Sequence, residues 1–337
     1  MGVTIHDVAE RAGVSIKTVS RVMNAEPNVR EAVRERVRAA MRELDYIPNA
    51  GARRMASDRS LLLGLFFFPQ LSSYITGIQL GAARRCRDRD YLLAAEPIEP
   101  GQREIPALIE RTVRRARLDG VILVPPQSND IAIVERLERL NVPFVRVSPG
   151  VEPDRGASVF VDERRGGFEI TRHLIELGHR EIAFLGGPMP STMRAPRFRR
   201  DGFLDAMAEA GLPVPDSRIV YGDFTFASGQ RCGDELLGVR KRPTAIVAAN
   251  DIMAAGVLSA AARRGLKVPQ DLSVTGFDDI QIATVVSPSL TTIRQPLEQI
   301  GATAADMLLG AQGGGGLEAT GRRLDIELVV RESTAPA

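Results

Sequence analysis

Cysteine, histidine and long apolar runs are scarce in this chain, and each scarcity excludes a class of protein. The two cysteines, Cys86 and Cys232, are far apart and belong to no CxxC or Cys/His cluster, so neither a disulfide framework nor a zinc site is expected. The three histidines are scattered, and the turn at His179 indicates favourable helix-end electrostatics rather than a metal site. The densest apolar run, Leu61–Pro69, is far shorter than the ~20 residues that cross a bilayer and predicts a buried strand.

Two further absences concern location and catalysis. The chain does not start with a basic segment followed by an apolar stretch and a cleavage site, so we expect a cytoplasmic location and no membrane partner. No GxSxG, HExxH, Walker A or GxGxxG motif occurs, and no nucleophile or metal constellation stands out. We therefore expect neither an enzyme nor a bound cofactor.

What the chain does contain is the composition of an ordinary globular protein with an uneven distribution of charge. Its 337 residues, 44% of them hydrophobic and 26% charged, exceed one typical domain of ~100–200 residues. Residues 1–60 hold 11 Lys/Arg against 8 Asp/Glu, whereas the remainder holds 33 against 34. The positive excess lies at the N-terminal end, which is where we expect nucleic acid to bind.

Residues 5–44 contain three short helical patterns separated by turn signals. In a helix-turn-helix the two helices cross closely, which requires a small residue near the middle of the first helix and a glycine in the turn; Ala9 and Gly13 meet both requirements. Ser15 is the expected cap of the second helix, and the third is predicted from about Glu31 to Leu44. A three-helix bundle without a DNA role would use similar packing. The offsets predicted to be buried hold Val8, Ala12, Val14, Val19 and Val22.

The second helix presents a polar face that suits the major groove of DNA. Lys or Arg on this face can donate to guanine, and the side chains of Ile16 and Thr18 can touch a thymine methyl group. The alternative is a solvated face whose charges serve solubility. The outward positions of the helix, at i, i+3, i+4 and i+7, are Lys17, Ser20, Arg21 and Asn24.

From Leu61 onward, apolar strands alternate with amphipathic helices, which predicts α/β architecture with parallel sheets covered on both faces. So many units exceed one compact sheet and favour two similar lobes. The glycine run within Gln312–Gly316 is expected to be a flexible loop, and the final six residues, ESTAPA, to be disordered. The predicted strands are LLLGLFFF, YLLAA, GVILV, PFVRV, SVFVD, EIAFLG, TAIVAA and LSVTGF.

Several motifs, in this order along the chain, resemble those of the LacI/GalR family of bacterial repressors. The N-terminal ones are TIHDVAERAGVSIKTVSRVMN and DYIPNAGARRMAS. Those that follow are VDERRGGFEITRHLIELGHREIAFLGGP, RRDGF, GDFTFASG, ANDIMAAG, LKVPQDLSVTGFDDI and SPSLTTIRQP. The resemblance therefore covers nearly the whole chain.

The resemblance implies a helix-turn-helix DNA-binding domain over residues 1–47, a hinge helix and linker over 48–60, and an effector-binding and dimerisation core over 61–337. The hinge matches Asn49–Ser57, and a helix below ~12–15 residues is marginal in water, so it is expected to fold only on DNA. Met55 takes the position of an apolar wedge in the minor groove; otherwise it is an ordinary linker residue. Arg30 replaces the family's usual capping serine, which leaves Asn28 as the expected cap of the third helix. The predicted DNA contacts are Thr4, Ser15, Ile16, Lys17, Thr18, Ser20, Arg21, Asn24, Asn49, Ala52, Arg53 and Met55.

The same resemblance implies a core like that of a periplasmic binding protein, in which two lobes close on a ligand and the chain crosses between them three times. One lobe is expected to hold about 61–161 and 293–322, and the other about 162–292 and 323–337. Ligands of open α/β sheets bind beyond the carboxyl ends of the strands, where this chain places carboxylate, amide, arginine and aromatic side chains. The predicted effector contacts are Tyr74, Ser148, Arg199, Phe224, Asn250 and Asp278.

This mixture of side chains favours a sugar or oligosaccharide effector, with a nucleoside or purine as the alternative. Four arginines between Arg194 and Arg200 form a basic loop that could instead favour an anionic effector, although only three lysines stand beside 41 arginines, so arginine is the usual cation of this chain. A sugar-binding protein without regulation, or a sugar-modifying enzyme, is the alternative from another class. The expected partners are double-stranded operator DNA with a pseudo-palindromic sequence, a small effector, and a second copy of the chain in a homodimer.

Overall fold

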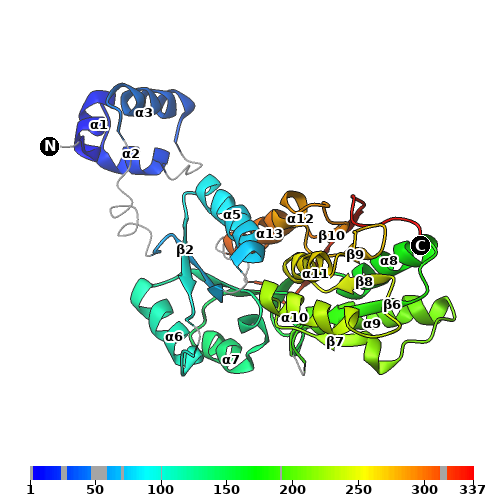
Figure 1. Ribbon diagram of the computed structural model, residues 1–337. Helices are drawn as coiled ribbons and strands as arrows, with labels where there is room; N and C mark the ends of the chain where they lie inside the picture. Colours follow the sequence, from blue (N-terminus) through cyan, green and yellow to red (C-terminus); the bar gives the residue numbers. More distant parts are fainter. Residues whose placement is uncertain are drawn as a thin grey trace. The chain divides into compact units, whose positions relative to one another are not determined.

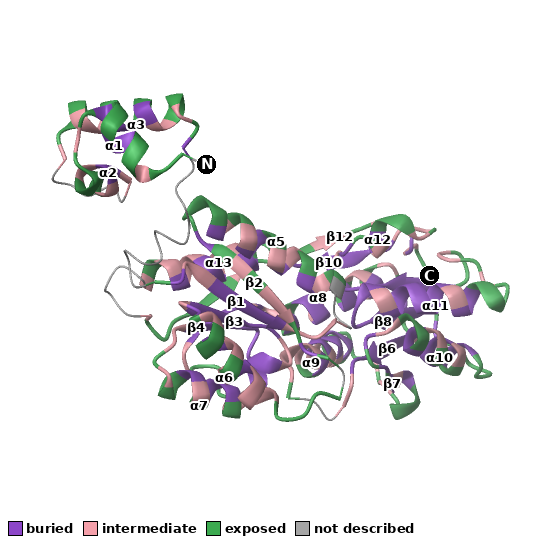
Figure 2. Ribbon diagram, turned by 90° about the vertical axis from the view of Figure 1, so that its left-hand side faces the viewer, coloured by how far each residue is buried: buried purple, intermediate pink, exposed green. Residues whose placement is uncertain are grey.

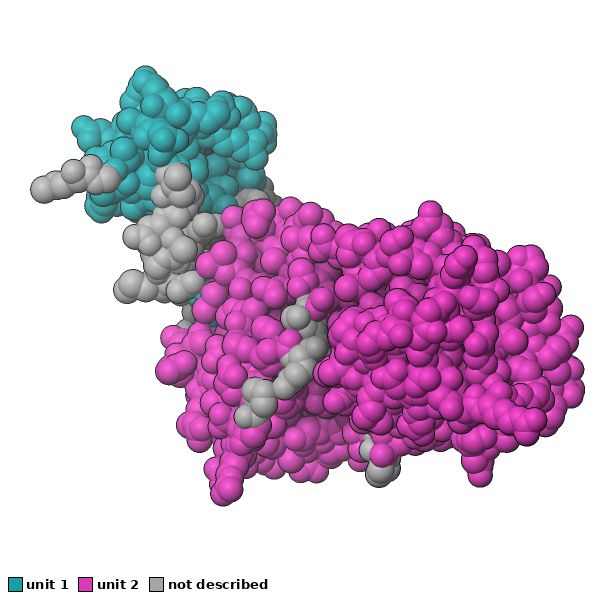
Figure 3. All heavy atoms as spheres, in the orientation of Figure 1, with its two compact units in different colours: residues 1–60 teal, residues 61–337 magenta. Residues whose placement is uncertain are grey.

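The structure is a computed structural model, and it divides into two compact units, Met1–Ser60 and Leu61–Ala337, which are considered separately (Figure 1, Figure 3). The residues described are 3–23, 29–46, 59–69, 72–99, 101–189, 192–311 and 317–337. Within these ranges no helix is long and apolar enough to span a membrane. The predicted features outside them are Asn24, Asn28, Asn49, Ala52, Arg53, Met55 and the glycine run at 312–316.

The described part of the first unit contains three helices, α1 (Ile5–Ala12), α2 (Ile16–Met23) and α3 (Glu31–Glu43), around a small apolar core. Gly13 ends α1 at φ +63, a left-handed conformation that favours glycine, and its N–H donates to carbonyl oxygens at the end of the helix. Arg30 is the N-cap residue of α3 and provides no side-chain hydrogen bond to it. The fully or nearly buried side chains of this core are Val8, Ala9, Ala12, Val19, Val22, Val37, Ala40 and Tyr46.

The second unit begins with a six-stranded sheet in the order β11-β5-β4-β3-β1-β2, and every pairing in it is parallel. One face packs against α5 (Ser72–Asp88) and α13 (Leu297–Ala311), and the other against α6 (Ile105–Ala116) and α7 (Ile131–Arg139). Apolar strands buried on both faces are typical of parallel sheets. The strands are β1 (Leu62–Phe67), β2 (Leu92–Pro97), β3 (Gly120–Leu123), β4 (Phe144–Val147), β5 (Ala157–Val161) and β11 (Gly321–Leu324).

A four-stranded parallel sheet in the order β7-β6-β8-β9 forms the second lobe. Its helices pack in two pairs, α8 with α9 and α10 with α11, and both pairs contribute to one apolar cluster with the sheet (Figure 1, Figure 2). The strands are β6 (Ile182–Gly186), β7 (Ile219–Tyr221), β8 (Ala245–Ala248) and β9 (Ser273–Thr275). The helices are α8 (Glu163–Glu176), α9 (Arg194–Glu209), α10 (Phe226–Leu237), α11 (Asp251–Arg263) and the short α12 (Ile282–Val285).

The chain passes between the two lobes three times. It leaves the larger sheet after β5, and returns through β10 (Thr292–Arg294) to α13. It leaves again from β11 into β12 (Glu327–Val329), which pairs antiparallel with β10. The unit is therefore a two-lobed α/β core with parallel sheets, and the all-α first unit precedes it, as the fold-class prediction states.

Two expectations from the sequence are wrong in the second lobe. The final segment is not disordered: Ser333 is fully buried and donates to Val274 O at 2.5 Å, and the Ala337 N–H donates to Leu177 O at 3.0 Å. His179 has no helix-end role, because it is buried and its ring nitrogens lie 2.9 Å from Thr244 Oγ1 and 3.0 Å from Ser273 Oγ. Burial lowers the pKa of His179, which favours the neutral ring over a cation that would interact with a helix dipole.

Candidate functional site

The outer face of α2 keeps its polar side chains accessible. Lys17 and Arg21 are exposed, and Ile16 is 39% exposed. Ser20 is half-buried on the same helix. Lys17 forms no hydrogen bond or ion pair with the part of the chain that the structure describes. The helix thus presents a cation and an apolar side chain that the unit itself does not use.

Three of the predicted DNA contacts have a structural role at helix starts. Thr4 and Asp7 form a capping box at α1, in which the Thr4 N–H donates to Asp7 Oδ2 at 2.7 Å. Ser15 Oγ accepts from the Thr18 N–H at 3.2 Å and lies 2.9 Å from Thr18 Oγ1. These hydroxyl groups therefore stabilise the starts of α1 and α2 within the unit.

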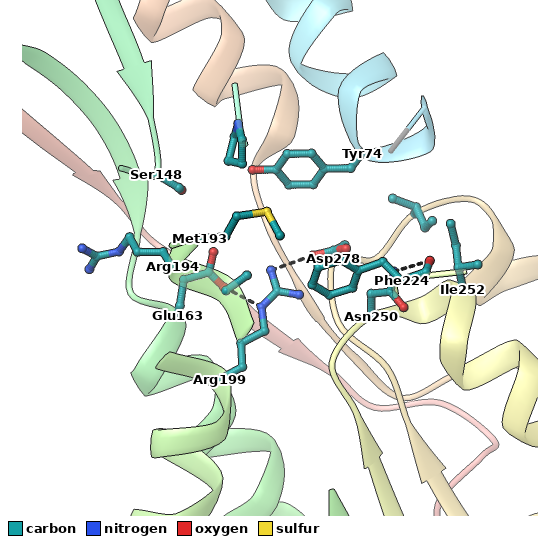
Figure 4. Close-up of a pocket in the computed structure, with 13 residues that line it drawn as sticks. Tyr74, Ser148, Glu163, Met193, Arg194, Arg199, Phe224, Asn250, Ile252 and Asp278 are labelled. Atoms are coloured by element: carbon teal, nitrogen blue, oxygen red, sulfur yellow. Dashed lines mark hydrogen bonds and ion pairs between the residues drawn. The ribbon is translucent and has the colours of Figure 1, made fainter. Parts of the chain in front are cut away.

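All six predicted effector contacts line one pocket of the second unit, which has about 600 Å³ of empty space, part of it open to solvent (Figure 4). We call it the Arg199 pocket. The first lobe contributes a wall made from α5 and from the loops that follow β3 and β4, and the second lobe contributes the charged side chains. The lining residues are Tyr74, Pro125 and Ser148 from the first lobe, and Glu163, Met193, Arg194, Ala195, Arg199, Phe224, Asn250, Ile252, Asp278 and Ile280 from the second.

The guanidinium of Arg199 is buried between two carboxylates (Figure 4). Its Nε donates to Glu163 Oε2 at 2.6 Å, its Nη2 lies 3.1 Å from Asp278 Oδ1, and its Nη1 donates to Ala249 O. Its face lies 3.6 Å from the centroid of the Phe277 ring. Burial alone would lower the pKa of Arg199, but the two carboxylates raise it, so the guanidinium stays charged and each of its three nitrogens contacts the protein.

Close helix packing fixes the position of Arg199. Gly167 of α8 faces the backbone of α9, and a Cβ at this position would lie 2.3 Å from Arg199 O. Gly202 of α9 faces α8 in return, where a Cβ would lie 1.9 Å from Arg164 O. The two glycines let the helix backbones touch, and this contact sets where the Arg199 side chain enters the pocket.

Asp278 is held by a loop of unusual backbone conformation. Its φ is +106, which is costly for a residue with a Cβ. Buried Asp251 supports this loop by accepting from the Ile280 N–H at 2.9 Å and from Thr292 Oγ1 at 2.6 Å. Gln295 Nε2 donates to Asp278 Oδ1 at 2.6 Å. Burial raises the pKa of Asp278 to about 6, although Arg199 acts in the opposite direction.

Phe224 and Asn250 complete the second-lobe wall. Asn250 caps α11 by accepting from the Met253 N–H at 2.9 Å, and its Nδ2 donates to Phe224 O at 3.2 Å. The ring of Phe224 lies against Gly187, where a Cβ would come within 2.3 Å of the ring. Across the pocket, burial raises the pKa of Tyr74, and the charges of Glu163 and Asp278 add to this effect, so the Tyr74 hydroxyl keeps its proton.

The prediction of a basic loop is wrong, because α9 begins at Arg194 and all four arginines lie in its first two turns. The Arg194 guanidinium lies 5.0 Å from the Phe160 ring centroid and 4.5 Å from that of Phe198, and Arg200 pairs with Asp201 at 2.9 Å. Arg194 thus contacts two aromatic rings but forms no hydrogen bond or ion pair with the described residues, and its buried Nε has no hydrogen-bond partner. The arginines therefore differ in their surroundings, since Arg199 and Arg200 pair with carboxylates and Arg194 does not.

The sequence reasoning missed Glu163, the second carboxylate of the pocket. The residue is 2% exposed and follows β5 by two positions, at the carboxyl end of a strand where ligands of α/β sheets bind. That position was the signal that could have identified it. Among the described residues, no group of three or more His, Cys, Asp or Glu side chains could hold a metal ion.

Comparisons with known proteins agree with this arrangement. Residues 4–49 match the bacterial regulatory proteins of the lacI family, and residues 171–334 match the periplasmic binding protein-like domain. The HTH-type transcriptional repressor PurR of Klebsiella pneumoniae is 36% identical over 311 residues, which are 91% of this chain and 89% of the relative. Catabolite control protein A of Priestia megaterium is 35% identical over 309 residues, which are 91% and 92% of the two chains.

Solved structures show the same likeness over nearly the whole chain. The lac repressor dimer bound to operator and the anti-inducer ONPF superimposes with a TM-score of 0.80 at 31% identity, covering 99% of this chain and 100% of that one. The complex of the transcriptional regulator CelR with cellobiose gives a TM-score of 0.75 at 31% identity, covering 98% and 99%. The chain belongs to the lacI family of bacterial regulatory proteins.

Proposed function

We propose that this protein is a transcription repressor in which α2 contacts operator DNA and the Arg199 pocket binds a small sugar that changes the affinity for that DNA. The observation that carries the choice of ligand is the state of the polar atoms in the pocket. Each nitrogen of the central cation already contacts the protein, whereas acceptor oxygens of the two carboxylates remain available. Such a pocket suits a ligand with many hydroxyl donors.

The available acceptors are Glu163 Oε1 and Asp278 Oδ2, neither of which accepts a hydrogen bond from the described residues. Two carboxylates surround a single guanidinium that already donates to both of them. The two carboxylates would repel an anionic ligand, and each nitrogen of Arg199 already contacts the protein, although Arg194 also lines the pocket and acts in the opposite direction. A neutral sugar avoids this repulsion, and the faces of Phe224 and Tyr74 can cover its C–H surface.

For the DNA-binding half, a homodimer would present two α2 helices to the half-sites of a pseudo-palindromic operator. The lac repressor is described as a dimer on its operator, which supports this proposal by similarity. Lys17 and Arg21 are exposed at positions where they can donate to guanine, and Ile16 offers an apolar contact for a thymine methyl group. The effector can change operator affinity only if it binds the DNA-competent and DNA-incompetent states unequally.

The experiment that tests this proposal has two parts. Genomic fragments are first selected by gel shift at moderate salt, and a thermal-shift panel of monosaccharides, disaccharides, sugar phosphates and nucleosides is then run on the full chain. We expect a sequence-specific complex, and a neutral sugar that raises the midpoint of unfolding; a ligand at 100 times its Kd adds about 2.7 kcal/mol of stability. A protein that binds no DNA sequence in preference to others contradicts the repressor role. A nucleoside or sugar phosphate that binds where no neutral sugar does contradicts the ligand class.

A further inference from the structure

A second cavity adjoins the Arg199 pocket in the first lobe. It has about 560 Å³ of empty space, part of it open to solvent, and we call it the Gln127 cavity. Its walls combine apolar side chains with two amides, a hydroxyl group and the carboxylate of Asp130. Its principal lining residues are Phe68, Ile105, Pro126, Gln127, Ile133 and Thr192.

The two cavities are adjacent along the chain at two separate places. Pro125 lines the Arg199 pocket and the next residue, Pro126, lines the Gln127 cavity. Met193 lines the Arg199 pocket and the preceding residue, Thr192, lines the Gln127 cavity. Because consecutive Cα atoms are only about 3.8 Å apart, the two cavities come close to each other at both places.

The topology of the larger sheet also favours a ligand at this position. Phe68 follows β1, and Pro126 and Gln127 follow β3, so both walls stand at the carboxyl ends of neighbouring parallel strands. The strand order reverses at β1, because β2 lies on one side of β1 and β3 and β4 lie on the other. Such a switch point opens a crevice where α/β proteins bind ligands.

Gln127 supplies the chemistry of the cavity. Its side chain is 2% exposed, yet neither Nε2 nor Oε1 has a hydrogen-bond partner among the described residues. A buried amide without a partner is costly, so such a group calls for a ligand or a bound water. Nearby Asn129 is already engaged, because its Oδ1 accepts from the Gly150 N–H at 2.6 Å.

We propose that the Gln127 cavity binds the second ring of an oligosaccharide whose first ring lies in the Arg199 pocket. The amide of Gln127 both donates to and accepts from ring hydroxyls, as its chemistry allows. Phe68 and Ile133 cover the apolar face of that ring. This inference rests on the proposed sugar-responsive function and names its ligand as at least a disaccharide.

The test compares a disaccharide with its own monosaccharide on the full-length protein. Isothermal titration calorimetry with glucose, cellobiose, maltose, galactose and lactose gives the affinity gained from the second ring. We expect at least one disaccharide to bind roughly tenfold more tightly than its monosaccharide. In Gln127→Leu this gain disappears, while the affinity for the monosaccharide stays unchanged.

Two controls separate a ligand contact from a structural role. Gln102→Leu makes the same change at an exposed position of the same lobe and should keep the preference for the disaccharide. Gln127→Leu should not lower the midpoint of thermal unfolding of the free protein, because leucine replaces a buried amide that has no partner. A structural glutamine would instead lower that midpoint when removed.

Three results would overturn the proposal of a second subsite. Equal affinities for one and two rings, a preference that survives in Gln127→Leu, or an ordered water as the only occupant of the cavity would each contradict it. If monosaccharides bind and change operator affinity without a preference for length, only this inference fails. If no sugar in the panel binds, the sugar class of the proposed function fails as well.

Discussion

The outer face of α2 and the Arg199 pocket present their charges in opposite ways. On α2, Lys17 is exposed and has no partner among the described residues. In the pocket, Arg199 is 3% exposed and two carboxylates surround it. Solvent-exposed cations can bind a partner with many phosphates, such as DNA. A small neutral ligand instead needs a preformed pocket from which water is largely excluded. The difference predicts that substitutions on α2 change binding alone, and that substitutions in the pocket change stability as well.

The largest expected effect comes from removing the central cation of the pocket. Arg199→Ala leaves Glu163 and Asp278 buried without a counter-charge, and breaking a buried pair costs about 3–5 kcal/mol. Chemical denaturation should show this loss, and effector binding should disappear. Arg11→Ala is the matched control, because Arg11 and Glu43 form an ion pair at 2.7 Å with both side chains more than half exposed. It should cost no more than about 1 kcal/mol, and similar losses in the two variants would contradict the comparison.

A second change acts on the same cation through packing. In Gly167→Ala the new Cβ would lie 2.3 Å from Arg199 O, so α9 must move away from α8. Overpacking of this kind costs about 1–3 kcal/mol and should also weaken the effector, as measured by denaturation and calorimetry. An alanine variant with unchanged effector affinity would show that the helix contact does not position Arg199. Gly310→Ala, where no atom lies within 4 Å of the added Cβ, is the control.

On α2 the expected effect is confined to DNA. Lys17→Ala should reduce the preference for operator over random DNA by about 1–3 kcal/mol if its ammonium group contacts a base. The midpoint of unfolding should stay unchanged, because the side chain is exposed and makes no ion pair in the described structure. Fluorescence anisotropy with operator and random duplexes measures both affinities. An equal loss on the two duplexes would mean that Lys17 contacts only phosphate.

The smallest expected effect is the dependence of the pocket on pH. Burial raises the pKa of Asp278 to about 6 from an ordinary value of 3.8, so the folded protein holds this proton more tightly than the unfolded chain. Its contribution to stability is therefore full below the ordinary value and is lost as the pH rises toward about 6. The affinity for the ligand should show the opposite trend, because the ionised carboxylate of Asp278 accepts hydrogen bonds from hydroxyl groups better than the protonated one does. The affinity for the ligand should therefore fall about tenfold for each pH unit below the pKa of Asp278. Calorimetry between about pH 5 and pH 8 checks this, with Asp278→Asn as the variant that should lose the dependence.

The sequence predicted most of the fold because its strands and helices carry strong apolar patterns. It failed to predict β11, which holds Arg322 and Arg323 and lies at the edge of its sheet, where an apolar pattern is not required. It also failed at the final segment, since the small polar residues around Ser333 form specific hydrogen bonds that composition does not reveal. These contacts depend on where distant segments meet.

The sequence predicted which residues line the Arg199 pocket better than it predicted the ion pairs among them. The six named residues follow strand ends or lie in recognisable motifs, and the structure brings them together. Glu163 was missed, although it pairs with Arg199 at 2.6 Å, because a glutamate at the start of a helix is usually an exposed residue that interacts with the helix dipole. Only the packing of α8 against α9 shows that this glutamate is buried.

Operator affinity of Asp278→Ala, measured with and without effector, tests most directly the proposal that the Arg199 pocket controls DNA binding by α2. This substitution removes one of two carboxylates and leaves Glu163 and Arg199 as a balanced pair, so the fold should persist. Anisotropy measurements should show operator affinity equal to that of the unmodified protein and no response to the effector that changes the unmodified protein's affinity. A variant that still responds to the effector as the unmodified protein does would contradict the claim.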